Sequence, residues 1–461
     1  MIGQRIASSF RDPDGFAFLD NGTLYRQINP SYKDNYALLI NSGLYENLVD
    51  SGYLIPHEEV GLKHIQSDLG YKIIRPEPIW FISYPYEWCF SQLKEAALLT
   101  LKIQKMALEF GMTLKDGSAY NIQFRRGKAV LIDTLSFEAY REAQLWFPYQ
   151  QICQHFIAPL ALMSYSDVRL NQLLRVYIDG IPLDLASSLL PFKTKLNFGL
   201  FSHIHLHAKS QRRFANKEIS GSGYKLKRSH LISLIDNLEV VINGLRCKGQ
   251  FWDNSNYYDV TSYSAKAFEE KKQLVSTFLE RINPKSIWDL GANSGLFSRI
   301  ASEKGIQVVS FDCNHSAVEK NYAECAKRKE VNILPILLDL VNPSPGIGWN
   351  NQERMSLIER GPAEAALVLA LIHHLAIANN LPFSLIADFL ANICNFLIIE
   401  FIPQDDPQVQ KLILTREYIF SNYNQSVFEK EFSEYFIIEA SIVISDSKRI
   451  IYLMKRRKAN K

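Results

Sequence analysis

The feature that most constrains the fold is a series of short apolar runs in the C-terminal half of the chain. Apolar runs separated by segments of helical length are typical of βαβ units, whose parallel sheet is covered by helices on both faces. The five runs are SIWDLG (286–291), QVVSFD (307–312), NILPILLD (332–339), AALVLALI (365–372) and NFLIIEF (395–401). This half of the sequence therefore predicts an α/β domain built on a parallel sheet.

The end of the chain departs from this alternation. FIIEASIVI (436–444) and RIIYLMKR (449–456) are apolar and are separated only by the polar turn SDSK. Two such runs joined by a short polar turn predict a β-hairpin rather than another crossover through a helix. We expect a Rossmann-like sheet of seven strands that ends in this antiparallel hairpin.

The turn after the first run indicates which cofactor the sheet holds. A dinucleotide fold needs the sequence G-x-G-x-x-G here, but this chain has Gly291, Asn293 and Gly295. Asp312 follows about 20 residues later, at the end of the second run, where a carboxylate can accept hydrogen bonds from the hydroxyls of a ribose. A cofactor without a pyrophosphate tolerates the missing glycine, since it brings no phosphate charge to the helix N-terminus.

The motif D-x-G-x-x-x-G, formed by Asp289, Gly291 and Gly295, resembles that of the class I S-adenosylmethionine (SAM)-dependent methyltransferases. The resemblance covers about residues 260–461 and includes the terminal hairpin. It implies that Asp289 helps to fix the amino-acid end of SAM and that Asp312 binds the ribose. The further cofactor-binding residues that it implies are Gly291, Ala292, Asn293 and Gly295 around the methionine portion, and Asp339 and Leu340 beside the adenine.

The segment LALIHHLAI (369–377) resembles the methyltransferase segment that faces the methyl-transfer centre. A base is needed only where the acceptor arrives protonated, and His373 or His374 is a candidate for that role at neutral pH. The alternative is that one histidine packs within the helix and the other lines the site. Glu400, at the end of the fifth run, is a third catalytic candidate, although carboxylates at strand ends are common.

The segment LVNPSPGIGWNNQERMSLIERG (340–361) is too long, and too rich in proline, glycine and paired Glu-Arg, for a bare connection. Long irregular segments of this kind often carry functional residues. We expect it to form part of the acceptor site or a lid, with a surface insertion as the alternative.

The N-terminal region holds a second constellation of polar residues. In LKDGSAYNIQFRRGKAVLIDTLSFE (114–138), Asp116 is followed by Asn121 and, after a hairpin-like run, by Asp133. Kinases use this spacing for a catalytic aspartate and two magnesium ligands, so the region remotely resembles a kinase-like α+β domain and implies a nucleotide and magnesium site. It lacks a glycine-rich loop, the usual His or Arg near the catalytic aspartate, and the Phe-Gly after the second metal ligand. A lysine on the third strand is also not evident, although Arg26 or Lys33 is a candidate substitute for it. The alternative is an Asx-turn with acids on solvated hairpin edges.

Composition shifts suggest where the domains divide. ANKEISGSGYKLKRS (215–229) combines glycine, serine and charge as linkers do. We expect an N-terminal accessory domain at 1–215 with a hairpin at 15–28, a helical stretch at 32–55 and mostly helices from 141. A linker and helical extension at 216–260 and a methyltransferase domain at 261–461 follow.

Three histidines, His203, His205 and His207, stand two residues apart in FSHIHLHAKS (201–210). On a strand they would share a face and could hold a metal ion, but on a helix they would diverge, and no fourth ligand is evident. We therefore predict no metal site.

Overall charge and cysteine content narrow the function classes. The formal net charge of +3 over 461 residues gives no indication of nucleic-acid or membrane binding. The six cysteines are scattered without a C-x-x-C pair, which favours reduced thiols. No apolar stretch reaches the length of a membrane span, and the first residues do not resemble a signal peptide. We expect a cytoplasmic protein.

The whole chain resembles a bacterial group of class I SAM-dependent methyltransferases, some of them labelled nodulation-related. The resemblance rests on LKDGSAYNIQF, IDTLSFE, NPSPGIGW and LALIHHLAI. It implies methyl transfer from SAM to an acceptor, which we expect to be a small molecule or metabolite, with the N-terminal domain acting in substrate recognition or regulation. The alternative is a SAM-binding regulatory protein with a pseudokinase-like module and no turnover.

Overall fold

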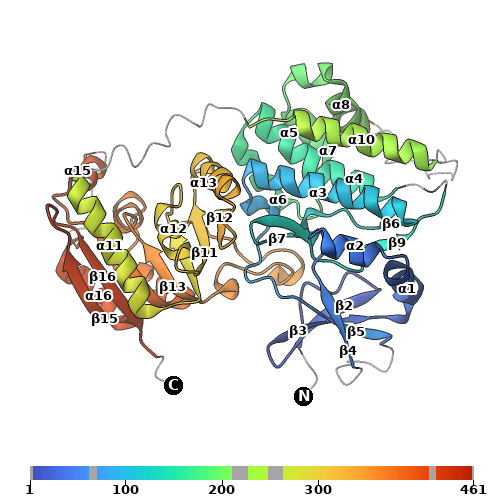
Figure 1. The fold of residues 1–461 in the computed structure, drawn as a ribbon. Coiled ribbons are helices and arrows are strands. Elements are labelled where there is room, and N and C mark those ends of the chain that lie inside the picture. Colours follow the sequence, from blue (N-terminus) through green and yellow to red (C-terminus); the bar gives the residue numbers. More distant parts are fainter. Residues whose placement is uncertain are drawn as a thin grey trace. The chain divides into compact units, whose positions relative to one another are not determined.

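The computed structural model describes residues 4–61, 70–142, 144, 146–209, 227–247, 263–414 and 422–458. The chain divides into two compact units (Figure 1). The first unit comprises Met1–Lys248 together with Gly346–Arg354, and the second comprises Gly249–Pro345 and Met355–Lys461. We call them the N-terminal unit and the sheet unit and describe each by itself.

The sheet unit is built on seven strands. They are β10 (Ser286–Leu290), β11 (Gln307–Asp312), β12 (Ile333–Leu337), β13 (Ala363–Val368), β14 (Cys394–Phe401), β15 (Phe436–Val443) and β16 (Ile450–Arg456). Their order is β12-β11-β10-β13-β14-β16-β15, with the first five parallel and β16 antiparallel to both of its neighbours. Numbered within the unit, this is 3-2-1-4-5-7-6, the class I methyltransferase order. The predicted fold class is therefore confirmed.

Helices cover both faces of this sheet, as a buried parallel sheet requires. They are α11 (Ala265–Ile282), α12 (Leu296–Ser302), α13 (His315–Arg328), α14 (Phe383–Ile393), α15 (Pro407–Ile413) and α16 (Gln425–Tyr435). The unit also contains the short elements η12 (Ile358–Arg360) and η13 (His374–Ala378), whereas η11 (Trp349–Asn351) belongs to the N-terminal unit. The amphipathic α11 buries Val275 and Phe278 against Ile287 and Val308 of the sheet. Asn314 caps α13, because its side chain accepts hydrogen bonds from the backbone N–H groups of Ser316 and Ala317.

The strand register brings four loops to one edge of the sheet. Leu290, the last residue of β10, lies opposite Phe311 of β11 and Val368 of β13. On the other side of β11, Asp312 lies opposite Leu337, the last residue of β12. Ligands of open α/β sheets bind outside the carboxyl ends of the strands where the strand order reverses, and in this sheet that point is next to β10.

The N-terminal unit begins with a five-stranded antiparallel sheet. Its strands are β1 (Gln4–Arg5), β2 (Gly15–Asp20), β3 (Thr23–Ile28), β4 (His57–Val60) and β5 (Lys72–Pro76), in the order β1-β2-β3-β5-β4. Asn21 and Gly22 both have positive φ angles and form the tight turn of the predicted 15–28 hairpin. The predicted helical stretch 32–55 contains α1 (Lys33–Asn41) and α2 (Leu44–Asp50), with η1 (Pro30–Tyr32) before them.

Helices dominate the rest of the N-terminal unit, as predicted for the part from residue 141, whereas the helix α3 was not predicted. The long α3 (Phe90–Glu109) is followed by two pairs of short strands, β6 (Met112–Leu114) with β9 (Phe137–Ala139), and β7 (Ile122–Arg125) with β8 (Lys128–Leu131). The remaining elements are η3 (Pro85–Glu87), η4 (Ala119–Asn121), α4 (Pro148–Ile152), η5 (Cys153–Ile157), α5 (Ala158–Tyr165), η6 (Val168–Gln172), α6 (Leu173–Val176), α7 (Leu183–Leu189), η7 (Phe192–Leu196), α8 (Phe198–Leu200), η8 (Phe201–Leu206) and α10 (Arg228–Gly244).

The helix α10 belongs to the N-terminal unit, which places the division of the chain later than the predicted boundary at 215. Asp236 and Glu239 of α10 both pair with Lys105 of α3, at 2.6 Å each. The structure thus places α10, which falls within the predicted linker and helical extension, in the N-terminal unit and α11 in the sheet unit. Most of the predicted linker and extension, at 210–226 and 248–262, lies outside the described residues.

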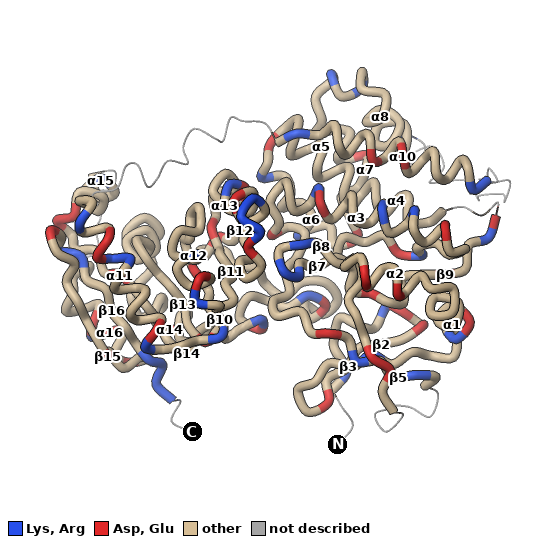
Figure 2. Tube along the Cα trace, in the orientation of Figure 1, with Lys and Arg blue, Asp and Glu red and all other residues tan. Residues whose placement is uncertain are grey.

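Acidic and basic residues are interspersed along both units, as expected from the small net charge (Figure 2). None of the helices in the described segments combines the length and apolar character that a membrane crossing requires. All six cysteines are free thiols.

Candidate functional site

The turn after β10 adopts a backbone that favours its glycines. Gly291 and Gly295 have φ angles of +78° and +80°, and Asn293 between them has +50°. The backbone N–H groups of Gly291 and Ala292 both donate to the carbonyl oxygen of Phe311, at 2.9 Å each. These two hydrogen bonds fix the turn to the end of β11, beside Asp312.

Gly295 has a second constraint besides its backbone angle. A Cβ atom at this position would lie 2.4 Å from Oδ1 of Asn321. Asn321 is itself fixed, because its Nδ2 donates to Ser310 Oγ at 2.8 Å and its Oδ1 accepts from Arg299 Nη2 at 3.0 Å. The turn therefore has room only for glycine at the start of α12.

Asp289 lies underneath this turn rather than on its open side. Its carboxylate is buried and accepts a hydrogen bond of 2.6 Å from the hydroxyl of Ser298 on α12. Burial raises the pKa of Asp289 to about 7. The residue links β10 to α12, and its predicted contact with the amino-acid end of a cofactor stays a prediction.

Asp312 joins the turn to the end of β11. Its Oδ2 accepts a hydrogen bond from the backbone N–H of Asn293 and its Oδ1 accepts one from that of Asn314, both at 2.8 Å. The side chain is partly exposed, and burial of its remainder raises its pKa. Because each carboxylate oxygen has two lone pairs, the oriented Asp312 can still accept two hydroxyl donors from a ligand.

The predicted adenine-binding residues follow on the neighbouring strand. Asp339 is exposed two residues after β12, and its Oδ1 accepts from the backbone N–H of Val341 at 2.9 Å. Leu340 is partly exposed. The backbone N–H of Leu338 donates to the carbonyl oxygen of Asp312 at 2.9 Å, so this loop lies beside the Asp312 loop.

The two candidate histidines differ in their surroundings. Their ring centroids are 4.2 Å apart, but His373 is buried whereas His374 is partly exposed. Burial lowers the pKa of His373 to about 2, and its Nδ1 has no hydrogen-bond partner among the described residues. Burial also lowers the pKa of His374. Both rings are therefore neutral at neutral pH, and His374 is the better placed to contact a substrate.

Glu400 was predicted as a catalytic candidate, but its side chain is completely buried and cannot contact a substrate. Its Oε2 accepts hydrogen bonds of 2.7 Å from Lys271 Nζ and from the backbone N–H of Ala370. Its Oε1 accepts from the Tyr263 hydroxyl, and Arg449 lies 3.6 Å away. With both oxygens occupied inside the protein, Glu400 is a positioning residue.

The residue that Glu400 positions is Ala370, at the start of the segment that carries the two histidines. Ala370 has a φ angle of +51°, in the left-handed region that residues with a Cβ rarely adopt. The hydrogen bond from its N–H to Glu400 holds the backbone in this conformation. Burial raises the pKa of Glu400 to about 7, and the positive charge of Arg449 opposes that rise.

Part of the 340–361 segment folds with the N-terminal unit, an outcome that neither of our expectations included. Residues Gly346–Arg354 belong to that unit. Glu353 pairs with Arg11 through two hydrogen bonds of 2.6 and 3.0 Å, and the guanidinium of Arg354 lies 4.4 Å from the ring centre of Tyr120. Local composition cannot reveal such long-range partners.

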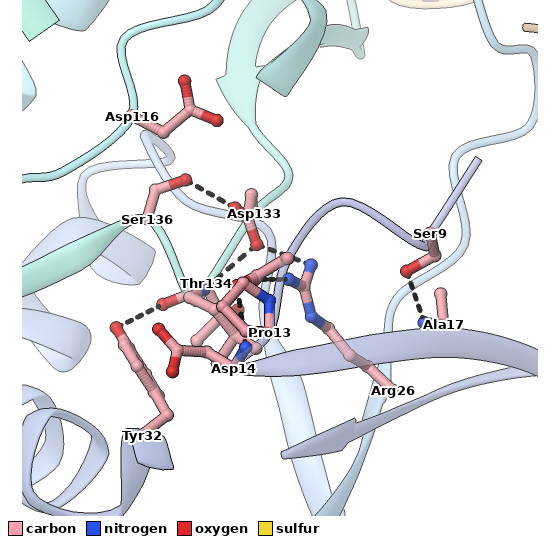
Figure 3. Close-up of polar contacts among 12 residues, drawn as sticks. Ser9, Pro13, Asp14, Ala17, Arg26, Tyr32, Asp116, Asp133, Thr134 and Ser136 are labelled. Carbon is pink, nitrogen blue, oxygen red and sulfur yellow. Dashed lines mark hydrogen bonds and ion pairs between the residues drawn. The ribbon is translucent and has the colours of Figure 1, made fainter. Parts of the chain in front are cut away.

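The structure brings the predicted N-terminal constellation together, and Figure 3 shows Asp116 and Asp133 with Ser136 between them. Asn121 Nδ2 donates to Asp116 Oδ2 at 2.9 Å and to Ser136 Oγ at 3.3 Å. The hydroxyl of Ser136 in turn donates to Asp133 Oδ2 at 2.6 Å. Asp116, Asn121 and Asp133 therefore converge through Ser136, and their assignment to a nucleotide or magnesium site stays a prediction.

Cations of the chain itself neutralise the acids around this constellation. Arg26 on β3 pairs with Asp133 at 2.5 Å and with Asp12 at 3.0 Å (Figure 3). Lys115, directly before Asp116, pairs with Asp14. From the sequence, Arg26 was predicted only as a substitute for the expected lysine, and the roles of Lys115, Asp12 and Asp14 were not predicted. The position of Lys115 directly before Asp116 in the sequence is the feature that could have indicated its role.

The three histidines of 201–210 have separate partners. His203 contacts the Tyr149 hydroxyl and Asn237 Oδ1, at 2.8 and 2.7 Å, and His205 contacts Ser187 and Thr194. His207 stacks on Tyr149. In the described segments, no three His, Cys, Asp or Glu side chains are grouped as a metal site requires.

Comparison with known proteins shows a relative along almost the whole chain, although no family model matches. The chain is 33% identical over 462 residues to the nodulation protein NoeA of Rhizobium meliloti (strain 1021), an alignment that spans 98% of this chain and 96% of that protein.

Similarities to solved structures are weaker. Magnesium protoporphyrin IX methyltransferase (ChlM) from Synechocystis PCC 6803 is 16% identical, with a TM-score of 0.31, over 41% of this chain and 84% of its own. The bifunctional kinase-methyltransferase WbdD is 13% identical, with a TM-score of 0.30, over 45% of this chain and 43% of its own. The family assignment rests on the nearly full-length alignment, by which this chain belongs to the family of the nodulation protein NoeA.

Proposed function

We propose that this protein is a SAM-dependent methyltransferase and that its sheet unit binds the cofactor. The observation that carries the proposal is the bond between Asp312 and the Gly291–Gly295 turn, made by the N–H of Asn293. This bond orients a ribose-binding carboxylate next to a turn that a ligand can approach closely. Both lie at the strand-order reversal of a sheet with class I methyltransferase topology.

The residues of the turn fit SAM better than a dinucleotide. A dinucleotide brings a pyrophosphate, which must approach the backbone of the turn closely at the glycine that Asn293 replaces. Here the N–H groups of Gly291 and Ala292 are already used by Phe311, and that of Asn293 by Asp312. An adenosyl cofactor without phosphate needs none of these three donors.

The chain's own residues divide the remaining work of the reaction. When bound, SAM supplies an electrophilic methyl group on a sulfonium, so catalysis consists largely of orienting an acceptor in line with it. Glu400 holds the backbone of Ala370 and thereby the His373-His374 segment, while Asp312 orients the ribose. His374, neutral at neutral pH and partly exposed, is our candidate for accepting a proton from the acceptor.

We further propose a small molecule or metabolite as the acceptor, since neither unit shows the one-signed charge that nucleic acid requires. The free cysteines support a cytoplasmic location.

The test of methyl transfer is to incubate the protein with methyl-labelled SAM and an extract of its source cells. Labelled product is expected from the natural protein and from Asp133→Asn but not from Asp312→Ala. SAM binding without any labelled product would favour the regulatory alternative.

A second candidate function concerns the N-terminal unit, because Asp116, Asn121 and Asp133 converge there. Carboxylate and amide oxygens are suitable magnesium ligands, so this unit is a candidate site for magnesium and ATP. Arg26 already neutralises Asp133, so we expect weak binding and little phosphotransfer. A thermal shift with magnesium and ATP that disappears in Asp133→Asn supports this function. No shift in the natural protein leaves the unit with a recognition or regulatory role.

A further inference from the structure

The N-terminal unit presents three large apolar side chains to solvent within seven residues. Phe192, Leu196 and Phe198 are 72%, 79% and 77% exposed, and Leu189 just before them is 41% exposed. We call these four residues the apolar tip. Single exposed apolar residues are common on proteins, but a group of this density marks an interaction surface.

The apolar tip is exposed because its backbone is fixed in this conformation. Thr194, in the middle of η7, is buried, and its hydroxyl donates to the carbonyl oxygen of Pro191 at 2.7 Å. The same hydroxyl oxygen lies 2.9 Å from His205 Nε2, while His205 Nδ1 lies 2.7 Å from Ser187 Oγ. These contacts tie η7 to η8 and to α7. The phenyl and leucyl groups cannot turn inward without breaking them.

Two lysines stand among the apolar residues of the tip. Lys193 and Lys195 alternate with the apolar residues and are exposed, and the sequence holds no Asp or Glu between residues 185 and 209. Figure 2 shows basic positions on the loop beside the label α8. On the neighbouring α10, the acids Asp236 and Glu239 are both paired with Lys105.

We propose that the apolar tip docks onto the surface of an anionic lipid bilayer. Aromatic and leucine side chains enter the boundary between headgroups and acyl chains, and neighbouring lysines bind anionic headgroups. Docking of this kind is peripheral and needs no membrane-crossing helix. We expected no membrane binding from the net charge of the whole chain, but that net charge is a sum over all residues and does not reveal a local group of lysines.

The proposal is tested by flotation of the full chain with two kinds of vesicle, phosphatidylcholine alone and phosphatidylcholine mixed with phosphatidylglycerol. The natural protein is expected to float with the anionic vesicles only, and added salt should weaken the binding because it screens the lysines. The triple variant Phe192→Ser, Leu196→Ser, Phe198→Ser should lose binding by roughly a hundredfold or more. Lys193→Gln with Lys195→Gln should lose roughly thirtyfold.

The matched control is Leu385→Ser on α14 of the sheet unit, which changes another strongly exposed leucine. It is expected to bind vesicles like the natural protein, and thermal melting should show that all variants remain folded, since each altered side chain is exposed. Failure of the natural protein to bind anionic vesicles overturns the proposal, as does full binding by the triple variant. A lipid-free dimer that requires the apolar tip and abolishes vesicle binding also overturns it, because a second copy would then be the occupant.

Discussion

Asp312 of the sheet unit and Asp133 of the N-terminal unit are held in opposite ways. In the sheet unit, Asp312 is oriented by two backbone N–H groups and Asp289 by the hydroxyl of Ser298. In the N-terminal unit, the cation Arg26 neutralises Asp133, and Lys115 neutralises Asp14. Uncharged donors orient a carboxylate without neutralising its negative charge, whereas a cationic partner neutralises that charge.

This difference separates a site ready for a ligand from one that is closed by its own side chains. Asp312 can bind the hydroxyls of a neutral ribose without any rearrangement. A magnesium ion at Asp133 would first have to displace Arg26. Glu400 provides an internal reference, because it lies in the sheet unit but is paired with Lys271 and Arg449 and has a structural role.

The largest effect on stability is expected from Lys271→Met. This variant tests whether the ion pair with Lys271 gives Glu400 a structural role. The change leaves a buried carboxylate without its main partner and should lower the free energy of unfolding by about 3 to 5 kcal/mol. Urea unfolding followed by circular dichroism measures it. The matched control is Lys272→Met, whose ion pair with Glu269 is on the surface and should contribute at most about 1 kcal/mol. Equal effects of the two variants would contradict the structural role of Glu400.

The next effect sharpens the comparison at Asp312. Asp312→Ala removes the acceptors of two charge-assisted hydrogen bonds and should weaken the binding of S-adenosylhomocysteine by about 1.5 to 3 kcal/mol. Titration calorimetry measures the change. Asp133→Ala, which removes an acid of the N-terminal unit, serves as the control and should leave this affinity unchanged. An unaltered affinity in Asp312→Ala would show that the ribose binds elsewhere.

A smaller effect is expected in the N-terminal unit from Arg26→Gln. The ion pair with Asp133 is mostly buried, so its loss should lower the free energy of unfolding by about 1 to 2 kcal/mol. Arg75→Gln is the matched control, because its pair with Glu58 is exposed and should contribute less than about 1 kcal/mol. If Arg26→Gln is as stable as Arg75→Gln in urea, the cation does not close this site.

The smallest expected effect is on pH dependence and concerns Asp289. Its folded-state pKa of about 7 lies above the ordinary value of 3.8, so the folded protein favours the protonated acid. The stability from this proton is present at low pH and is lost as the pH rises through about 7. Between pH 6 and pH 8, the natural protein should lose about 1 kcal/mol more stability than Asp289→Asn. Parallel pH profiles of the two proteins in urea unfolding would contradict the raised pKa.

The sequence predicted what depends on local pattern. The five apolar runs became β10, β11, β12, β13 and β14, and the terminal hairpin became β15 and β16, because period and turn composition decide such elements. The spacing from the glycine turn also brought Asp312 beside Asn293. A residue at the end of a strand, next to a short loop, has few alternative positions, so its sequence spacing predicts its neighbours.

The sequence did not predict what depends on distant partners. Glu400 looked like a catalytic acid at a strand end, since nothing in its own segment shows that Lys271 and Arg449 converge on it. The folding of Gly346–Arg354 with the N-terminal unit likewise depends on Arg11, far away in the chain. Asp116, Asn121 and Asp133 were brought together as expected, but the neutralising cations were not foreseen.

The central claim is that the sheet unit binds SAM at the turn after β10, and calorimetric titration of the full chain with S-adenosylhomocysteine and with NAD tests it most directly. We predict micromolar-scale binding of S-adenosylhomocysteine and none of NAD, because Asn293 stands where a pyrophosphate needs a glycine and the N–H groups of Gly291, Ala292 and Asn293 are already used within the turn. Tight binding of NAD with no heat from S-adenosylhomocysteine would contradict the account.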